Sequence, residues 1–168
     1  MRSTENIFSP CCVQRLEVIG SRQRTCKQGS GEKVTLVIRR TRCVLCRKIH
    51  HELPDILVPY KRYTAECIEQ VVSKANPIDV PADESTLYRW KEWFDVWAPY
   101  AVGCLTSIAA RFRFDLPVKD LSGPSLTVLQ TFGRVEGHLN GWLANVVRPI
   151  ANLHLWIHTR FAFLSGPS

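Results

Sequence analysis

The sequence predicts an α+β fold in which a small, zinc-ribbon-like β-hairpin unit precedes a helical domain. Three observations predict it: β-branched runs lie in the N-terminal third, cysteine pairs flank those runs, and helical patterns fill the remainder. An apolar fraction of 45% is typical of a folded chain, and 168 residues suit one ordinary domain or two small ones. We expect the two units to cover residues 1–63 and 64–164.

Two β-branched runs predict the hairpin. Residues 16–19 form the first run, which ends at Gly20, and residues 34–38 form the second. The turn between them, at residues 28–32, contains two glycines. A lone hairpin of this size is marginally stable, and a metal ion is one means of stapling it.

The helical part begins after a connector. Residues 52–63 contain two prolines and predict an extended segment. A helix is expected over residues 65–75 with Thr64 as its N-cap, and the next helix opens with Asp83 or Ser85 as its cap.

Aromatic residues mark the second helix. They recur with an apolar neighbour at helical spacing, at Leu87, Trp90, Phe94 and Trp97. Pro99 is expected in the first turn of a further helix that runs towards Arg113. Later helical stretches are expected at about residues 125–147 and 149–163, with breaks at Gly133, Gly137 and Gly141.

The charge of the chain is strongly asymmetric. Residues 1–63 carry 13 Lys/Arg against 5 Asp/Glu, whereas residues 64–168 carry 9 against 10. The whole excess of +7 therefore belongs to the hairpin unit. An acidic partner is expected for this half, most often nucleic acid.

Seven cysteines and the absence of an apolar signal sequence at the start indicate a reduced, cytoplasmic setting. Clustered cysteines then favour metal binding over disulfides. The longest uncharged run, residues 96–110, is too short to span a bilayer, so no membrane association is expected.

The sequence Cys43-Val44-Leu45-Cys46 lies within a run of arginine and lysine, and two histidines follow it. Thiolates at i and i+3 on a tight turn can bind one Zn²⁺ ion. A second pair of ligands should precede the first strand, where Cys11 and Cys12 lie. The sequence therefore predicts one zinc ion between two metal-binding turns.

The sequence does not decide which residue is the fourth zinc ligand. Cys11 is adjacent to Cys12, and adjacent residues rarely both reach one metal. The CxxC spacing instead places a ligand at Ser9, which is a poor zinc ligand. Other candidates are His50, His51 and Cys26; a three-ligand site, or one that no longer holds metal, are further alternatives.

Residues 85–94 resemble the recognition helix of a helix-turn-helix, within a segment that spans residues 64–97. Arg89 and Lys91 would then face outward. The alternative is a core helix with an aromatic stripe, and too few residues separate this helix from the preceding one for a full intermediate helix.

The sequence gives no support for an enzyme. It contains no nucleophile elbow and no phosphate-binding glycine-rich loop. His50-His51-Glu52 lacks the second histidine of a zincin, and the carboxylates after residue 64 do not follow alternating strands as a two-metal nuclease requires. His154 and His158 lie one turn apart, but we interpret them as part of a packed helix.

Three segments carry a resemblance: residues 16–22, residues 38–46 with the CxxC, and residues 50–63, which read HHELPDILVPYKRY. They resemble a family of domains of unknown function from Gram-positive bacteria, similar to the zinc-binding N-terminal region of insertion-sequence transposases. The resemblance covers roughly residues 9–95. Such families open with Cys-Pro-x-Cys, whereas this chain has Ser9-Pro10-Cys11-Cys12. The resemblance implies Cys12, Cys43 and Cys46 as ligands, followed by a DNA-binding helical segment.

These observations together predict a DNA-binding zinc-ribbon protein, related to transposition and without catalytic activity. The expected phosphate contacts come from the hairpin unit, and two further basic residues are expected to reach the groove: Arg22, Arg24, Arg39, Arg40, Arg42, Arg47 and Lys48, with Arg89 and Lys91. Alternatives are a protein-interaction module that docks a transposase or recombinase, a remnant of a mobile element, and a metal-dependent enzyme with an open zinc site.

Overall fold

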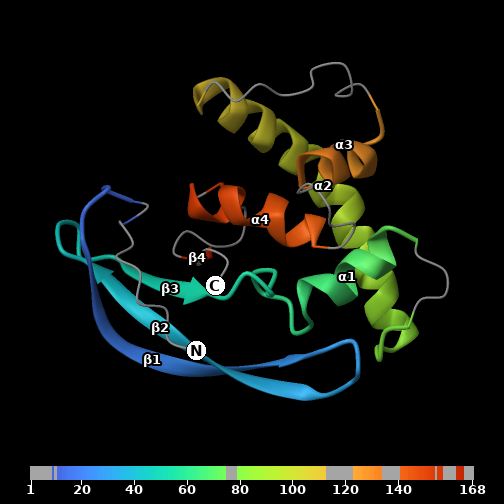
Figure 1. The fold of residues 1–168 in the computed structure, drawn as a ribbon, viewed down its shortest axis with the longest axis horizontal. Coiled ribbons are helices and arrows are strands. Elements are labelled where there is room, and N and C mark those ends of the chain that lie inside the picture. The colour runs from blue at the N-terminus through green and yellow to red at the C-terminus, as the bar shows by residue number, and fades with distance from the viewer. Residues whose placement is uncertain are drawn as a thin grey trace.

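In the described part of the chain, four strands form one mixed sheet, and four helices pack beside it (Figure 1). The computed structural model describes residue 9 and residues 11–74, 79–112, 123–133, 141–153, 155–156 and 162–164. The strands, in the spatial order β1-β2-β3-β4, are β1 (Leu16–Lys27), β2 (Lys33–Cys43), β3 (Ile49–Leu53) and β4 (Ala162–Leu164). The first three are antiparallel, and β4 runs parallel to β3. The predicted α+β class is confirmed.

The hairpin is longer than its apolar runs indicated. β1 has 12 residues and β2 has 11, because pairing continues through polar segments that lack an apolar pattern. Cross-strand hydrogen bonds do not depend on side-chain type, so the arginine-rich ends still join the ladder. Gly20 lies at a bulge with φ of 146°, where other residues would be strained. The predicted turn is confirmed, and the Gln28 N–H donates to the Glu32 carbonyl at 2.9 Å.

Residues 52–63 are only partly the extended connector that the prolines predicted. The first two complete β3. A bridge between Leu57 and Thr64 closes the remainder on itself, and a bridge between Lys27 and Tyr63 pairs it with the hairpin. Leu57 and Val58 are fully buried. Burial of these apolar side chains determines the path, which proline content alone cannot indicate.

The four helices are α1 (Ala65–Val72), α2 (Glu84–Phe112), α3 (Ser125–Gly133) and α4 (Trp142–Asn152). Thr64 occupies the N-cap of α1, as predicted, but its hydroxyl contacts the Cys67 thiol at 3.2 Å instead of a backbone N–H. Asp83 caps α2 by accepting a 2.8 Å hydrogen bond from the Thr86 N–H.

The prediction that Pro99 starts a new helix is wrong, because α2 continues through it. Pro99 removes one backbone hydrogen bond, but Trp97, Ala98 and Ala101 around it are buried in the core. Their packing outweighs the lost bond.

Beyond α2, the breaks predicted at Gly133 and Gly141 are confirmed, whereas Gly137 lies outside the described residues. The prediction of helix over residues 149–163 is confirmed only for residues 149–152, which end α4; residues 155–156 are not helical, and residues 154 and 157–161 lie outside the described residues. Pro149 lies inside α4, and residues 162–164 form β4 on the open edge of β3. Pairing with a strand about a hundred residues away is not visible in a local pattern.

The core is aromatic and continuous between sheet and helices. Trp90, Phe94 and Trp97 are buried, as the stripe predicted, and Trp93 stacks on Trp97 at a centroid distance of 5.2 Å. The sheet contributes Ile38 and Leu53 to the same cluster of side chains. In the part of the chain that is described, no helix combines the length and apolar character needed to cross a membrane.

Candidate metal centre

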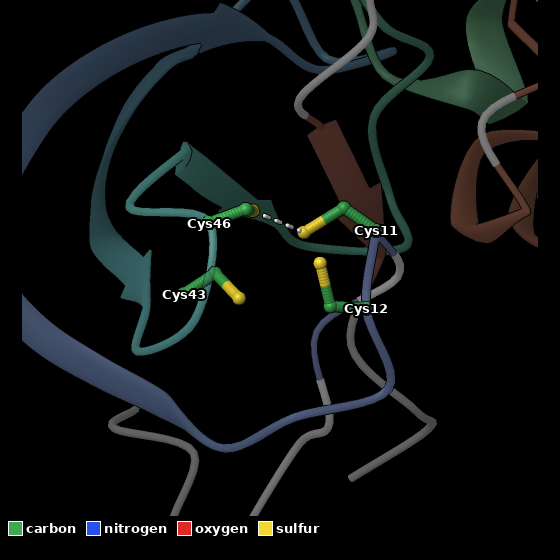
Figure 2. Close-up of side chains that lie close together, drawn as sticks. All are labelled: Cys11, Cys12, Cys43 and Cys46. Carbon is green, nitrogen blue, oxygen red and sulfur yellow. Dashed lines mark hydrogen bonds between the residues drawn. The ribbon is translucent and has the colours of Figure 1, made fainter.

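Four cysteines converge at the base of the hairpin. The sulfurs of Cys11, Cys12, Cys43 and Cys46 all lie within 4.8 Å of one another, and Figure 2 shows them pointing towards a common centre. The Cys11 and Cys46 sulfurs lie 3.2 Å apart. None of the seven cysteines forms a disulfide. This arrangement can hold one metal ion by four thiolates.

Two turns with the same backbone geometry present these thiols. In the turn of residues 43–48, the Arg47 N–H donates to the Cys43 carbonyl at 3.0 Å, and the Cys43 N–H donates to the Lys48 carbonyl at 2.9 Å. The turn of Ser9 and residues 11–14 repeats this pattern with an offset of 34 positions. Its Val13 N–H donates to the Ser9 carbonyl at 2.8 Å, and the Ser9 N–H donates to the Gln14 carbonyl at 2.6 Å.

The backbone angles strengthen this equivalence. Val13 and Arg47, which follow the last cysteine of each turn, are both left-handed, with φ of 55° and 62°. Such φ values are uncommon for residues other than glycine and carry a backbone strain energy, which the hydrogen bonds of each tight turn offset. We call the two turns the N-terminal knuckle (Ser9 with residues 11–14) and the C-terminal knuckle (residues 43–48).

Ser9 therefore occupies the position that Cys43 holds in the C-terminal knuckle. Its side chain is buried, and its hydroxyl lies 2.7 Å from the Cys11 sulfur and accepts a 3.2 Å hydrogen bond from the Cys12 N–H. Cys11, one residue before Cys12, brings the fourth thiol into the cluster. Adjacent cysteines rarely both reach one metal, but here the bend of this knuckle directs both sulfurs into the cluster.

The thiols of the cluster have different pKa values, and a cation would stabilise their ionised forms. Burial opposes ionisation of Cys43, but hydrogen bonds from Ser9 and from the backbone of Cys46 and Leu45 outweigh it and lower the pKa of this thiol from 9.0 to about 6. The hydrogen bond with Cys46, followed by burial, raises the pKa of Cys12 to about 12, and burial raises the pKa of Cys11. Without a cation, the thiols share little negative charge; a metal ion would allow them to ionise together.

His50 adds a nitrogen donor beside the cysteines. It is fully buried, and its Nε2 lies 3.3 Å from the Cys11 sulfur. A histidine at this distance can stabilise a thiolate or serve as a ligand itself. Of the other candidates for the fourth ligand, neither His51 nor Cys26 belongs to the cluster.

The donor set narrows the choice of metal. Soft thiolates favour Zn²⁺, Cu(I) or iron over Mg²⁺ and Ca²⁺, which prefer oxygen ligands. Four thiolates without an open position are typical of a structural zinc site. Bound here, a metal would join the start of β1 to the turn between β2 and β3 and fix the register of three strands.

The structure separates the predicted basic residues into three groups. Arg22, Arg24 and Arg40 lie on one face of the sheet. Gly20, Arg22 and Arg24 share a face because each is two residues from the next on β1, and Arg40 joins that face because it pairs with Gly20. Arg39 binds Glu52 on the other face, and Arg42 lies 3.9 Å from Glu17. Arg47 and Lys48 are exposed on the C-terminal knuckle, and Arg89 and Lys91 are exposed on α2.

Two carboxylate pairs thus reduce the number of arginines open to phosphate. Sequence analysis could not identify them, because Glu52 becomes a partner of Arg39 only through strand register. It also missed Lys27, Lys33 and Arg62, which join Arg22 and Arg24 around one cleft. The dipeptide Lys61-Arg62 after Pro59 was the available signal. His154 and His158 lie outside the described residues.

The equivalence of Ser9 and Cys43 makes a testable prediction about metal affinity. The variant Cys11→Ser should bind Zn²⁺ at least roughly 100-fold more weakly, since it loses a direct ligand, and outer-shell partners alone are worth about 10–100-fold. Adding Ser9→Cys to that variant should restore affinity, because the N-terminal knuckle then matches the C-terminal one. Competition with a chromophoric chelator measures both affinities. If the double variant binds no better than Cys11→Ser, the two knuckles are not equivalent.

Comparison with curated proteins and with solved structures finds no match. The transposase relation and the Gram-positive origin that the resemblance implied are not among the findings. Residues 9–90, which hold the cysteine cluster, the first three strands and α1, match a family described as Domain of unknown function (DUF6431).

Proposed function

We propose that the protein binds DNA through its basic β-sheet unit, that a zinc ion in the cysteine cluster fixes the base of this unit, and that the protein has no catalytic activity of its own. The observation that carries the proposal is the placement of Arg22, Arg24 and Arg40 on one face of the sheet. In the described part of the chain, none of these three forms a salt bridge with a carboxylate. Unneutralised arginines on one face suit a phosphate backbone.

Strand β3 connects the candidate metal centre with the face that carries the three arginines. His50 and His51 are neighbours on β3, so their side chains point to opposite faces of the sheet. His50 contacts the cysteine cluster, while burial together with Arg22 and Arg40 lowers the pKa of His51 on the basic face. Metal binding on one side therefore supports the arrangement of charge on the other.

Salt dependence of DNA binding tests the proposal. We expect the affinity for a labelled duplex, measured by fluorescence anisotropy, to fall as salt rises with a log–log slope of about −0.9 per phosphate contact. The double variant Arg22→Gln/Arg40→Gln should make this slope shallower by about 2. Arg111→Gln, an exposed arginine at the end of α2, is the charge control. A slope near zero, or no binding to any DNA, contradicts the proposal.

The same DNA-binding assay can test the two exposed basic residues of α2. Arg89 and Lys91 lie on α2, and Arg89 donates to the Ser85 carbonyl at 3.1 Å. If Arg89→Gln/Lys91→Gln changes base preference as well as affinity, α2 reads DNA as a recognition helix would. Loss of affinity alone would assign these residues to phosphate contacts.

Protein docking is a second candidate function, favoured by apolar side chains on the knuckles. Val13 and Leu45 are 74% and 67% exposed, although both are aliphatic. Under this alternative, a transposase or recombinase covers the knuckles, and Val13→Ser/Leu45→Ser weakens binding to that partner while DNA affinity stays unchanged.

A further inference from the structure

The basic face ends in a cleft with a chemistry more specific than positive charge. The cleft has a volume of about 890 Å³ and lies between β1, β2 and the segment that follows Pro59. Its charged lining consists of Arg22, Arg24, Lys27, Lys33 and Arg62, with His51 beside them, and no carboxylate is among the described residues that line it. A concave surface lined by one sign of charge attracts an anion more strongly than a flat one does.

The floor of the cleft is apolar. Cys26, Ile38 and Leu53 line it and are buried to 5% exposure or less. An anion that carried only charge, such as free phosphate, would leave this floor without a contact. The combination of cationic rim and apolar floor instead suits a ligand with an anionic part and a flat apolar part.

An exposed aromatic ring completes the site. Tyr60 lines the cleft, yet 67% of it is open to solvent, and its φ of 64° places it on a left-handed turn. A tyrosine in this conformation carries a backbone cost that an ordinary surface position would not require. Aromatic rings beside cationic grooves are the usual platform on which unpaired bases stack.

Backbone bonds hold the wall that carries Tyr60. The Lys27 N–H donates to the Arg62 carbonyl at 2.8 Å, and the Thr64 N–H donates to the Lys27 carbonyl at 3.0 Å. The Arg24 guanidinium donates to the Lys61 carbonyl at 2.7 Å, directly beside Tyr60. The aromatic ring and the cations thus belong to one preorganised unit and lose little freedom on binding.

We infer that this cleft binds a single-stranded nucleic-acid segment, with its phosphates on Arg22 and Arg62 and one base stacked on Tyr60. The inference rests on the proposed function and names the form of nucleic acid that the site takes. A duplex hides the faces of its bases and presents a convex rod of phosphates, so it cannot use the apolar floor or the ring. A single strand can use both.

The test compares strands with and without bases. A labelled single-stranded oligonucleotide of about eight nucleotides should bind more tightly than a duplex of the same length. Tyr60→Leu should weaken this binding roughly ten-fold, the range of one base stack, without changing the salt slope. Phe112→Leu is the matched control, because Phe112 is 50% exposed at the end of α2, outside residues 85–94, which resemble a recognition helix. An abasic strand of equal length should bind more weakly and should not respond to Tyr60→Leu.

Charge and base recognition can be separated in the same titrations. Arg62→Gln should reduce the salt slope for the single strand by about 0.7, while Arg111→Gln should not. If Tyr60→Leu and Phe112→Leu behave alike, and the duplex still binds with a steep salt dependence, the inference is overturned and the proposed function stands. If neither nucleic acid binds, both fail. Displacement of the strand by an equal concentration of mononucleotide would make the cleft a free-nucleotide site and also overturn the inference.

Discussion

Serine in place of Cys46 is expected to abolish tight zinc binding and to loosen the base of the sheet. Cys46 provides one of the four thiols, and its sulfur lies 3.2 Å from that of Cys11. Structural zinc contributes about 10–16 kcal/mol in small zinc-finger peptides, where binding and folding are one event. Here sheet and helices share an aromatic core, so we expect loss of order at the knuckles and of part of this stabilisation, without global unfolding.

Elemental analysis of tag-free protein measures the first effect, with about one zinc ion per chain expected in the parent and none in Cys46→Ser. Thermal unfolding measures the second. Cys104→Ala is the control, because Cys104 is a buried thiol on α2 outside the cluster. Equal zinc content in Cys46→Ser and Cys104→Ala would show that the cluster is not the metal site, and absence of zinc from the parent would favour a site that has lost its metal.

The thiol pKa values also predict how zinc affinity depends on pH. At neutral pH, Cys43, with a pKa of about 6, is already largely ionised, whereas Cys12, with a pKa of about 12, holds its proton. Burial also raises the pKa of Cys11, so zinc must displace at least two protons from Cys11 and Cys12. Affinity should therefore rise with pH near neutrality, by roughly a hundred-fold per pH unit for two protons. Calorimetric titration in buffers of different ionisation enthalpy counts the released protons.

Replacement of Glu69 by alanine is expected to be the most destabilising change outside the metal centre. Glu69 lies on α1 and is 6% exposed, and its two carboxylate oxygens accept 3.0 Å hydrogen bonds from the Gly141 and Leu143 N–H groups. These donors belong to the first turn of α4, whose N-cap is a glycine without a capping side chain. Glu69 therefore caps a helix 72 positions further along the chain and complements its dipole.

Glu69→Ala leaves two donors without their acceptor and removes a negative charge from the start of α4. We expect a loss of about 2–4 kcal/mol in the free energy of unfolding, measured by urea denaturation. Glu69→Gln keeps one acceptor oxygen and should lose less. Glu66→Gln, on the exposed side of the same helix, is the control and should stay within about 0.5 kcal/mol. Equal stability of Glu69→Ala and Glu66→Gln would contradict the capping role.

The pH dependence of stability provides a second measure of Glu69. Burial raises the pKa of this carboxyl above 4.5, although its two N–H donors oppose the shift. A raised pKa means that the folded state binds the proton more tightly than the unfolded state does. The contribution of Glu69 to stability should therefore fall as pH rises from about 4.5 through the raised pKa, and Glu69→Gln should remove this slope.

The sequence by itself determined the α+β class, the turn at residues 28–32, the helix start at Thr64, and the breaks at Gly133 and Gly141; for α2 it left Asp83 and Ser85 as alternative caps. Each depends on neighbours a few positions apart: β-branched runs, caps and glycines. The aromatic stripe from Trp90 to Trp97 was equally visible, because helical periodicity places its members on one face.

Only the tertiary structure decided the long-range features. It joined β4 to β3, carried α2 through Pro99, and paired Arg39 with Glu52 through strand register. These outcomes depend on which distant segments meet in one core, and local propensity carries no information about that.

The candidate metal centre could be predicted from the sequence only in part. The CxxC at Cys43 and Cys46 was recognisable as half of a site from spacing alone, whereas the role of Cys11 was not, because a thiol beside Cys12 departs from that spacing. The repeated hydrogen bonds of the two knuckles brought its sulfur into the cluster and Ser9 into the place of a cysteine. The set of candidate ligands depends on backbone geometry, which residue spacing describes only when the turns keep their usual residues.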